Sequence, residues 1–112
     1  MLNIHLTPGI LPTDLEPVTE ILNAVRTVQT TPEALNRERD WWPAGTVAHL
    51  VVARDGAGRV LGFGEAHRFP NTASGKFYAD VAVHPKYRGL GVVAALVSAV
   101  ERFCADCGAR RI

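Results

Sequence analysis

The chain of 112 residues lacks the features that mark membrane-spanning, secreted and nucleic-acid-binding proteins. It has no run of about 18 apolar residues, so neither a membrane-spanning helix nor a membrane partner is expected. Residues 1–7 do not place an apolar core after a basic stretch, which disfavours a secretory signal. Twelve lysine and arginine residues balance eleven aspartate and glutamate residues, for a formal charge of +1. This balance predicts no nucleic-acid partner.

Cysteine is also scarce, because the chain has only Cys104 and Cys107. A single C-x-x-C has no second pair to complete a four-ligand zinc site, so no metal is expected. Residues three apart share one face of a helix, and a free cysteine packs as a small apolar side chain. We therefore predict that both cysteines pack in the core of a reduced, cytoplasmic protein. The alternative is a redox or metal-binding role.

Apolar residues make up 47% of the chain and charged residues 21%. This composition and length are those of one ordinary globular domain spanning residues 1–112. Period-2 and helical spacing of the apolar residues, with glycine and proline breaks between them, predict an α+β fold with a largely antiparallel sheet. The expected ranges are a strand at 2–6, a helix from 13–16 to 26–29, a helix at 32–41, strands at 46–54, 60–68 and 76–84, and a helix at 89–107.

Two helix ends carry specific expectations. Thr13 and Glu16 have the spacing of a capping box at the start of the first helix. Gly108 is a plausible C-cap for the last helix, and residues 109–112 look like the entry to a further strand. Helical spacing predicts that the last helix buries Val92, Val93, Leu96, Val97, Val100, Phe103 and Cys104.

The stretch 79–95 organises the rest of the chain, because it reads as a strand, a glycine turn and a helix start. Gly89 and Gly91 let the backbone approach a ligand closely, and the first N–H groups of a helix have no internal partner. Such a turn is suited to binding a phosphate. Two alternatives are a helix-capping turn without a ligand and a dinucleotide site. The dinucleotide fingerprint expects an acidic residue where Arg110 and Arg111 stand.

Residues 83–93, Val-His-Pro-Lys-Tyr-Arg-Gly-Leu-Gly-Val-Val, resemble the acyl-CoA signature of the GNAT superfamily of N-acyltransferases. The family pattern is arginine or glutamine, two residues, glycine, one residue, then glycine or alanine. Arg88 and Gly91 match it, and Val93 departs from it. The predicted order of elements, β-α-α-β-β-β-α, is also similar to the family's, so the resemblance extends over essentially the whole chain.

The resemblance implies acetyl-CoA as co-substrate and a set of contacts to it. Backbone amides at the end of the fourth strand would meet the pantetheine and the thioester oxygen, and those of the turn would hold the pyrophosphate. The implied contacts are Val81, Ala82, Val83, Lys86, Arg88, Gly89, Leu90, Gly91, Val92 and Val93.

The reaction implied is N-acetyl transfer to a primary amine, of a small molecule or a protein, by direct attack in a ternary complex. It needs a group that removes a proton from the ammonium. For this base we rank Glu65 first and Asp80 second, followed by His67 and His84. The alternative for either acid is a solvated side chain or a partner for an arginine.

Tryptophan occurs only at Trp41 and Trp42. The resemblance implies that the second helix and its flanking loop form a wall of the acceptor site, so both are candidate substrate contacts. The alternative is that they anchor a polar helix to the body of the protein.

A complete GNAT domain continues with further strands and a helix that carries a tyrosine acid. We therefore expect residues 1–112 to form an incomplete GNAT domain, which lacks the C-terminal strands and helix. The second reading of function is a non-catalytic CoA-binding or assembly module. In either reading a homodimer or a complementing partner chain would cover the exposed edge of the fourth strand.

Overall fold

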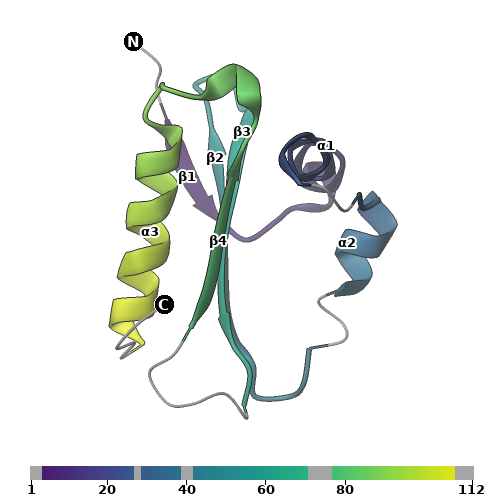
Figure 1. The fold of residues 1–112 in the computed structure, drawn as a ribbon, viewed down its shortest axis with the longest axis vertical. Helices are drawn as coiled ribbons and strands as arrows, with labels where there is room; N and C mark the ends of the chain where they lie inside the picture. Colours follow the sequence, from purple (N-terminus) through teal and green to yellow (C-terminus); the bar gives the residue numbers. More distant parts are fainter. Residues whose placement is uncertain (1–3, 27–28, 39–41, 71–76, 108–112) are drawn as a thin grey trace.

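A four-stranded sheet with helices on both of its faces organises the chain (Figure 1). The structure, a computed structural model, describes residues 4–26, 29–38, 42–70 and 77–107. The strands follow one another across the sheet in the order β1-β2-β3-β4, and each neighbouring pair is antiparallel. The elements are β1 (His5–Pro8), α1 (Leu15–Val25), α2 (Pro32–Glu38), β2 (Val47–Arg54), β3 (Val60–Arg68), β4 (Tyr78–Val83) and α3 (Val92–Asp106).

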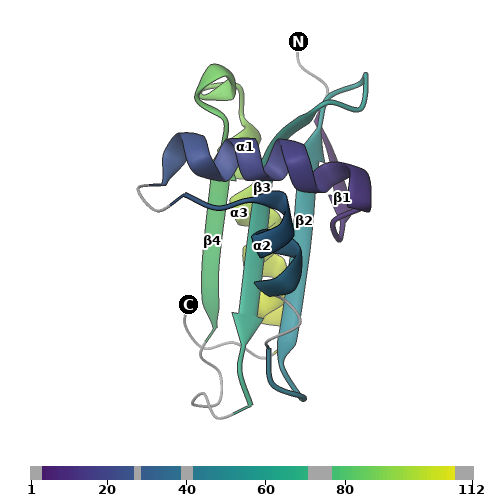
Figure 2. The ribbon, with the colours of Figure 1, turned by 90° about the vertical axis from the view of Figure 1, so that its right-hand side faces the viewer.

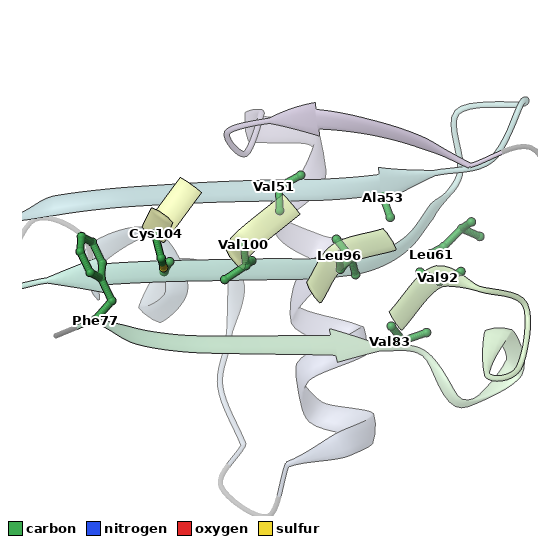
Figure 3. Packing of buried hydrophobic residues seen from close by; sticks show 10 residues of the cluster. Val51, Ala53, Leu61, Phe77, Val83, Val92, Leu96, Val100 and Cys104 are labelled. Carbon is green, nitrogen blue, oxygen red and sulfur yellow. The ribbon is translucent and has the colours of Figure 1, made fainter. Parts of the chain in front are cut away.

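The two faces of the sheet bury two separate apolar clusters, because successive strand residues point to opposite faces. Helix α3 covers one face, and α1 crosses the other, with α2 beside it (Figures 1 and 2). The cluster under α3 includes Val51, Ala53, Leu61, Ala66, Phe77, Val83, Val92, Leu96, Val100 and Cys104 (Figure 3). The cluster under α1 contains Val18, Ile21, Leu22, Leu35, Val52, Phe63 and Ala82.

Two glycines in β3 allow α3 to pack closely on the sheet. A Cβ atom on Gly62 would lie 2.9 Å from Cδ1 of Leu96, and one on Gly64 would lie 3.1 Å from Cγ2 of Val100. Both distances are shorter than ordinary van der Waals contacts. The missing side chains on β3 therefore fix the height of α3 above the sheet.

The start of α1 differs from the predicted capping box. A short 3₁₀ segment, Pro12–Asp14, precedes the helix, and the carboxylate of Asp14 accepts a hydrogen bond from the amide of Leu11 at 2.9 Å. The same carboxylate accepts two hydrogen bonds from the guanidinium of Arg54, at 2.9 and 2.6 Å. This bidentate pair, rather than Thr13 and Glu16, ties the start of α1 to β2.

The predicted order of elements is confirmed, and several bounds are corrected. The first strand, His5–Pro8, ends at Pro8 rather than at residue 6, because Thr7 and Pro8 pair with β2, and an edge strand tolerates a proline. Residues 2 and 3 of the predicted strand lie outside the described residues. Helix α3 begins at Val92 rather than Gly89. Gly108, residues 109–112 and the predicted end of the second helix at 39–41 lie outside the described residues.

The expected burial is wrong at two positions on α3. Val93 is 48% exposed, because the buried stripe of α3 consists of Val92 and the residues that follow it at intervals of four. Cys104 is fully buried, as predicted, but Cys107 is exposed because it lies at the C-cap, beyond the last helical turn.

Candidate functional site

The turn between β4 and α3 is built to leave backbone groups accessible. A 3₁₀ segment, Pro85–Tyr87, follows β4, and Nδ1 of His84 accepts a hydrogen bond from the amide of Lys86 at 3.2 Å. Gly89 and Gly91 then take φ angles of 80° and 84°. Residues with side chains rarely adopt such angles. The two glycines therefore set the chain direction that leads into α3.

Gly91 is the N-cap of α3, and no side chain caps the helix there. The hydrogen bond from the amide of Ala95 to the carbonyl of Gly91, at 3.1 Å, closes the first turn of α3. The amides of the residues between them, 92–94, have no intrahelical partner. Leu90 and Val93 are about half exposed, at 47% and 48%, so the mouth of this turn is open to solvent. The donors and the helix dipole suit an anion, and the exposed side chains of Lys86 and Arg88 add positive charge.

Strand β4 has an unpaired outer edge in the part of the chain that the structure describes. The amide of His84 donates to the carbonyl of Leu61 at 3.2 Å, on the β3 side. Because backbone groups of alternate residues point to the same side of a strand, those of Ala82 and Asp80 also face β3. The N–H and C=O groups of Val81 and Val83 therefore face the outer edge.

A groove of about 310 Å³ lies between this outer edge and α3. Its lining residues are Ala79, Asp80, Val81, Val97, Val100 and Glu101. Since β4 leads into the glycine turn and α3 leads out of it, the groove and the turn belong to one continuous surface. Of the predicted acetyl-CoA contacts on β4, Val81 lines the groove and Val83 faces the same edge. Ala82 instead turns its backbone groups toward β3 and buries its side chain in the cluster under α1.

The two predicted carboxylates lie opposite each other in the register of β3 and β4, on the face that α1 covers. Oε1 of Glu65 is 3.3 Å from Nδ1 of His67. The geometry is not that of a hydrogen bond, and within the described residues this buried Nδ1 has no hydrogen-bond partner. Asp80 differs, because Oδ2 forms an ion pair with Arg26 and Oδ1 accepts a hydrogen bond from the amide of Val81 at 2.9 Å.

Aromatic rings surround the imidazole of His67. The ring centroids of Trp42, Phe69 and Tyr78 lie 5.0, 4.8 and 5.2 Å from that of His67. Trp42 thus packs against His67, which in turn lies beside Glu65. Trp41 lies outside the described residues. The remaining candidate, His84, is held beyond the end of β4 as the cap of the 3₁₀ segment.

Sequence reasoning missed two features of this site. No local pattern indicates the pairing of Arg26 with Asp80, since the two are 54 residues apart. The ring cluster around His67 was also missed, although alternation along β3 places His67 on the same face as Glu65.

The described residues contain neither a metal-binding cluster nor a membrane-spanning helix. No group of three or more His, Cys, Asp or Glu side chains within them is arranged to hold a metal ion. None of the helices described is long and apolar enough to cross a membrane.

Comparisons with known proteins identify the family of this chain. The model of the acetyltransferase (GNAT) family matches residues 15–112. A search of curated protein sequences found no match. Among solved structures, a GNAT superfamily phosphinothricin acetyltransferase from Sinorhizobium meliloti, in complex with AcCoA, is similar at 27% identity and a TM-score of 0.72. It covers 93% of this chain, and this chain covers 60% of it.

Two further structures share the fold. Ard1 from Thermoplasma volcanium is 24% identical with a TM-score of 0.70, over 93% of this chain and 66% of its own. The GCN5-related glucosamine N-acetyltransferase region of a fungal multi-domain GH3 β-N-acetylglucosaminidase is 20% identical with a TM-score of 0.79, over 98% of this chain and 13% of its own. The chain thus spans less than two thirds of the first two of these structures. The family model matches residues 15–112, which is most of the chain. The chain therefore belongs to the GNAT acetyltransferase family.

Proposed function

We propose that this chain binds acetyl-CoA and transfers its acetyl group to a primary amine by direct attack in a ternary complex. The observation that carries the proposal is the uncapped N-terminus of α3, with Gly91 in the left-handed region and an open turn before it. The residues present fit the ligand. A Cβ atom on Gly89 would have no neighbour within 4 Å, so a phosphate has room to approach the backbone.

In this reaction the chain's own residues hold the pyrophosphate, stabilise negative charge and accept a proton. The amides of residues 92–94, with Lys86 and Arg88, hold the pyrophosphate. The outward amide of Val83, and that of Val81 once it is free, donate hydrogen bonds along the edge of β4. They stabilise negative charge that develops on the thioester oxygen. Acetyl-CoA supplies an activated acetyl group when it is bound. As the bond from nitrogen to the acetyl carbon forms, the C–S bond of the thioester would break, and CoA would leave as a thiol that carries the proton lost by the nitrogen in forming the amide.

In this proposal Glu65 accepts a proton from the substrate ammonium, which leaves a neutral amine that can attack the thioester. The side chain of Glu65 is 21% exposed, so solvent reaches it, and it lies on the face from which an amine can approach β4. Arg26 and the amide of Val81 both contact the carboxylate of Asp80, which makes Asp80 a poor proton acceptor. The acceptor is a small-molecule amine or a protein amino group that passes beside Trp42.

Calorimetric titration with acetyl-CoA tests the proposal. The parent chain should bind, and the double variant Arg88→Glu, Gly91→Asp should not, because it reverses a charge and places a branched side chain at a positive φ angle. Because Gly91→Asp strains the backbone, a second variant, Leu90→Glu, adds negative charge at the turn without that strain. It should weaken binding roughly tenfold or more.

The matched control is Leu11→Glu, since Leu11 is an equally accessible leucine, 59% exposed, outside the turn. Its affinity for acetyl-CoA should equal that of the parent. Failure of a folded parent to bind acetyl-CoA would overturn the proposal. Binding without turnover of any amine in a broad panel would instead indicate the CoA-binding module.

A further inference from the structure

The outward amide of Val81 is not free on the edge of β4. Oδ1 of the preceding residue, Asp80, accepts its hydrogen bond at 2.9 Å. The other carboxylate oxygen, Oδ2, pairs with the guanidinium of Arg26, which is the C-cap of α1. One side chain therefore connects the end of α1 to a backbone donor on the open edge of the sheet.

Asp80 lies at the junction of two surfaces of the protein. By register with Glu65 it belongs to the face under α1. It also lines the groove between β4 and α3, on the other side of the sheet edge. Its carboxylate thus reaches around the edge of β4 at the place where the two surfaces meet.

The contacts of Asp80 can open at low cost. The side chains of Arg26 and Asp80 are 45% and 37% exposed, so water competes for both. An exposed ion pair contributes little to stability, and a ligand oxygen can replace the carboxylate at the amide with little net loss.

From this geometry we infer that Asp80 is a movable cover of the Val81 amide, anchored by Arg26, and not the proton acceptor of the reaction. The inference rests on the proposed binding of acetyl-CoA. When acetyl-CoA enters the groove, one of its carbonyl oxygens replaces Oδ1 at the amide. Arg26 keeps the displaced carboxylate close by, on the face under α1. The cover satisfies an edge donor while the groove is empty and lowers the affinity for the ligand.

Calorimetry with acetyl-CoA on Asp80→Ala tests the inference. Removing the cover should tighten binding about threefold to tenfold, the worth of one hydrogen bond that no longer has to be displaced. Acetyl-CoA is anionic, so loss of any nearby negative charge also tightens binding. The matched control is therefore Glu101→Ala, which removes the same charge from the same groove. The gain with Asp80→Ala must exceed that of the control.

Asp80→Asn provides a second variant in case the alanine variant does not fold. It keeps an oxygen that can accept from the Val81 amide but loses the ion pair with Arg26, so its affinity should lie between those of the parent and Asp80→Ala. In the ¹⁵N-labelled parent, the amide resonance of Val81 should shift on addition of acetyl-CoA, and in Asp80→Ala it should already be shifted without ligand.

The outcomes separate this inference from the proposed function. If the parent binds acetyl-CoA and Asp80→Ala binds equally or more weakly than Glu101→Ala, the cover is rejected and the acetyl-CoA site stands. If neither the parent nor either Asp80 variant binds, both proposals fail together.

Discussion

The two faces of the sheet use alternate residues of the same strands for different purposes. The face under α3 is apolar along most of its length, and glycines at 62 and 64 bring the helix close to it. The face under α1 is apolar only in part, and the carboxylates of Glu65 and Asp80 lie on it beside the ring cluster of His67. The α3 face is therefore packed along most of its length, whereas the α1 face combines a buried apolar cluster with partly exposed charged side chains.

The largest expected effect is on activity, from Glu65→Gln on the α1 face. With an amine that the parent acetylates, the rate of CoA release should fall about 100- to 10,000-fold, because the neutral amide cannot accept the ammonium proton. The free energy of unfolding should change little. Glu16→Gln, in the exposed first turn of α1, is the control and should retain the parent rate. A full rate in Glu65→Gln would remove Glu65 as the base.

On the α3 face, Leu96→Ala should act on stability instead. Leu96 is fully buried between α3 and β3, so its truncation leaves a cavity and should lower the free energy of unfolding by about 2–5 kcal/mol. Urea denaturation measures this change. At temperatures where the variant is folded, it should still bind acetyl-CoA. A variant of full stability would show that this face is not the one that holds the fold.

A smaller loss of stability, about 2–3 kcal/mol, is expected for Asp14→Asn, which breaks the buried pair with Arg54. This pair differs from Glu65 and Asp80 on the α1 face, because its charges stabilise the fold. The Arg54 guanidinium lowers the pKa of Asp14 in the folded protein. The pair therefore contributes fully above the usual aspartate pKa, about 3.9, and its contribution is lost as the pH falls through the lower folded value.

The measurement is urea denaturation of the parent and Asp14→Asn across the acid range. The difference in stability between them should be constant near neutral pH and should shrink below about pH 4. A difference that does not depend on pH would mean that the carboxylate charge of Asp14 contributes nothing.

The smallest effect compares the two cysteines of α3. Cys104→Ser places a hydroxyl in the apolar cluster and should cost about 1–3 kcal/mol, whereas Cys107→Ser should stay within about 0.5 kcal/mol. Burial raises the pKa of the Cys104 thiol, so an alkylating reagent should modify Cys107 and spare Cys104 in the folded protein. Equal rates of modification would contradict the packing of α3.

Local sequence patterns predicted the order of elements. The errors in the element bounds arose where contacts between distant residues determine the structure. Apolar spacing predicted α1, β2, β3 and the buried stripe of α3. The register of β1 depends on its pairing with β2, which no local pattern encodes. The pattern also could not show that Gly89 and Gly91 would adopt positive φ and delay the helix to Val92.

The candidate site was predictable in its parts rather than in its arrangement. The glycine pattern located the turn, whereas the common face of Glu65 and Asp80 depends on the register between β3 and β4. Pairing of an acid with an arginine was a stated alternative for either residue, and the structure shows it for Asp80. The identity of the arginine depends on where the chain after α1 meets β4, which only the fold determines. The roles of these residues in binding and catalysis stay predictions.

The two glycines of β3 also affect the position of the turn before α3. Helix α3 and the turn before it form one continuous piece of backbone, so the distance of the helix from β3 sets where the amides of the turn lie relative to the edge of β4. A single methyl group at Gly62 would lie 2.9 Å from Cδ1 of Leu96 and 3.0 Å from the carbonyl oxygen of Ala82, so the side chain of Leu96 or the helix itself would have to shift. For the acetyl-CoA site proposed above, the fit of the ligand would therefore depend on residues beneath the helix that the ligand never touches.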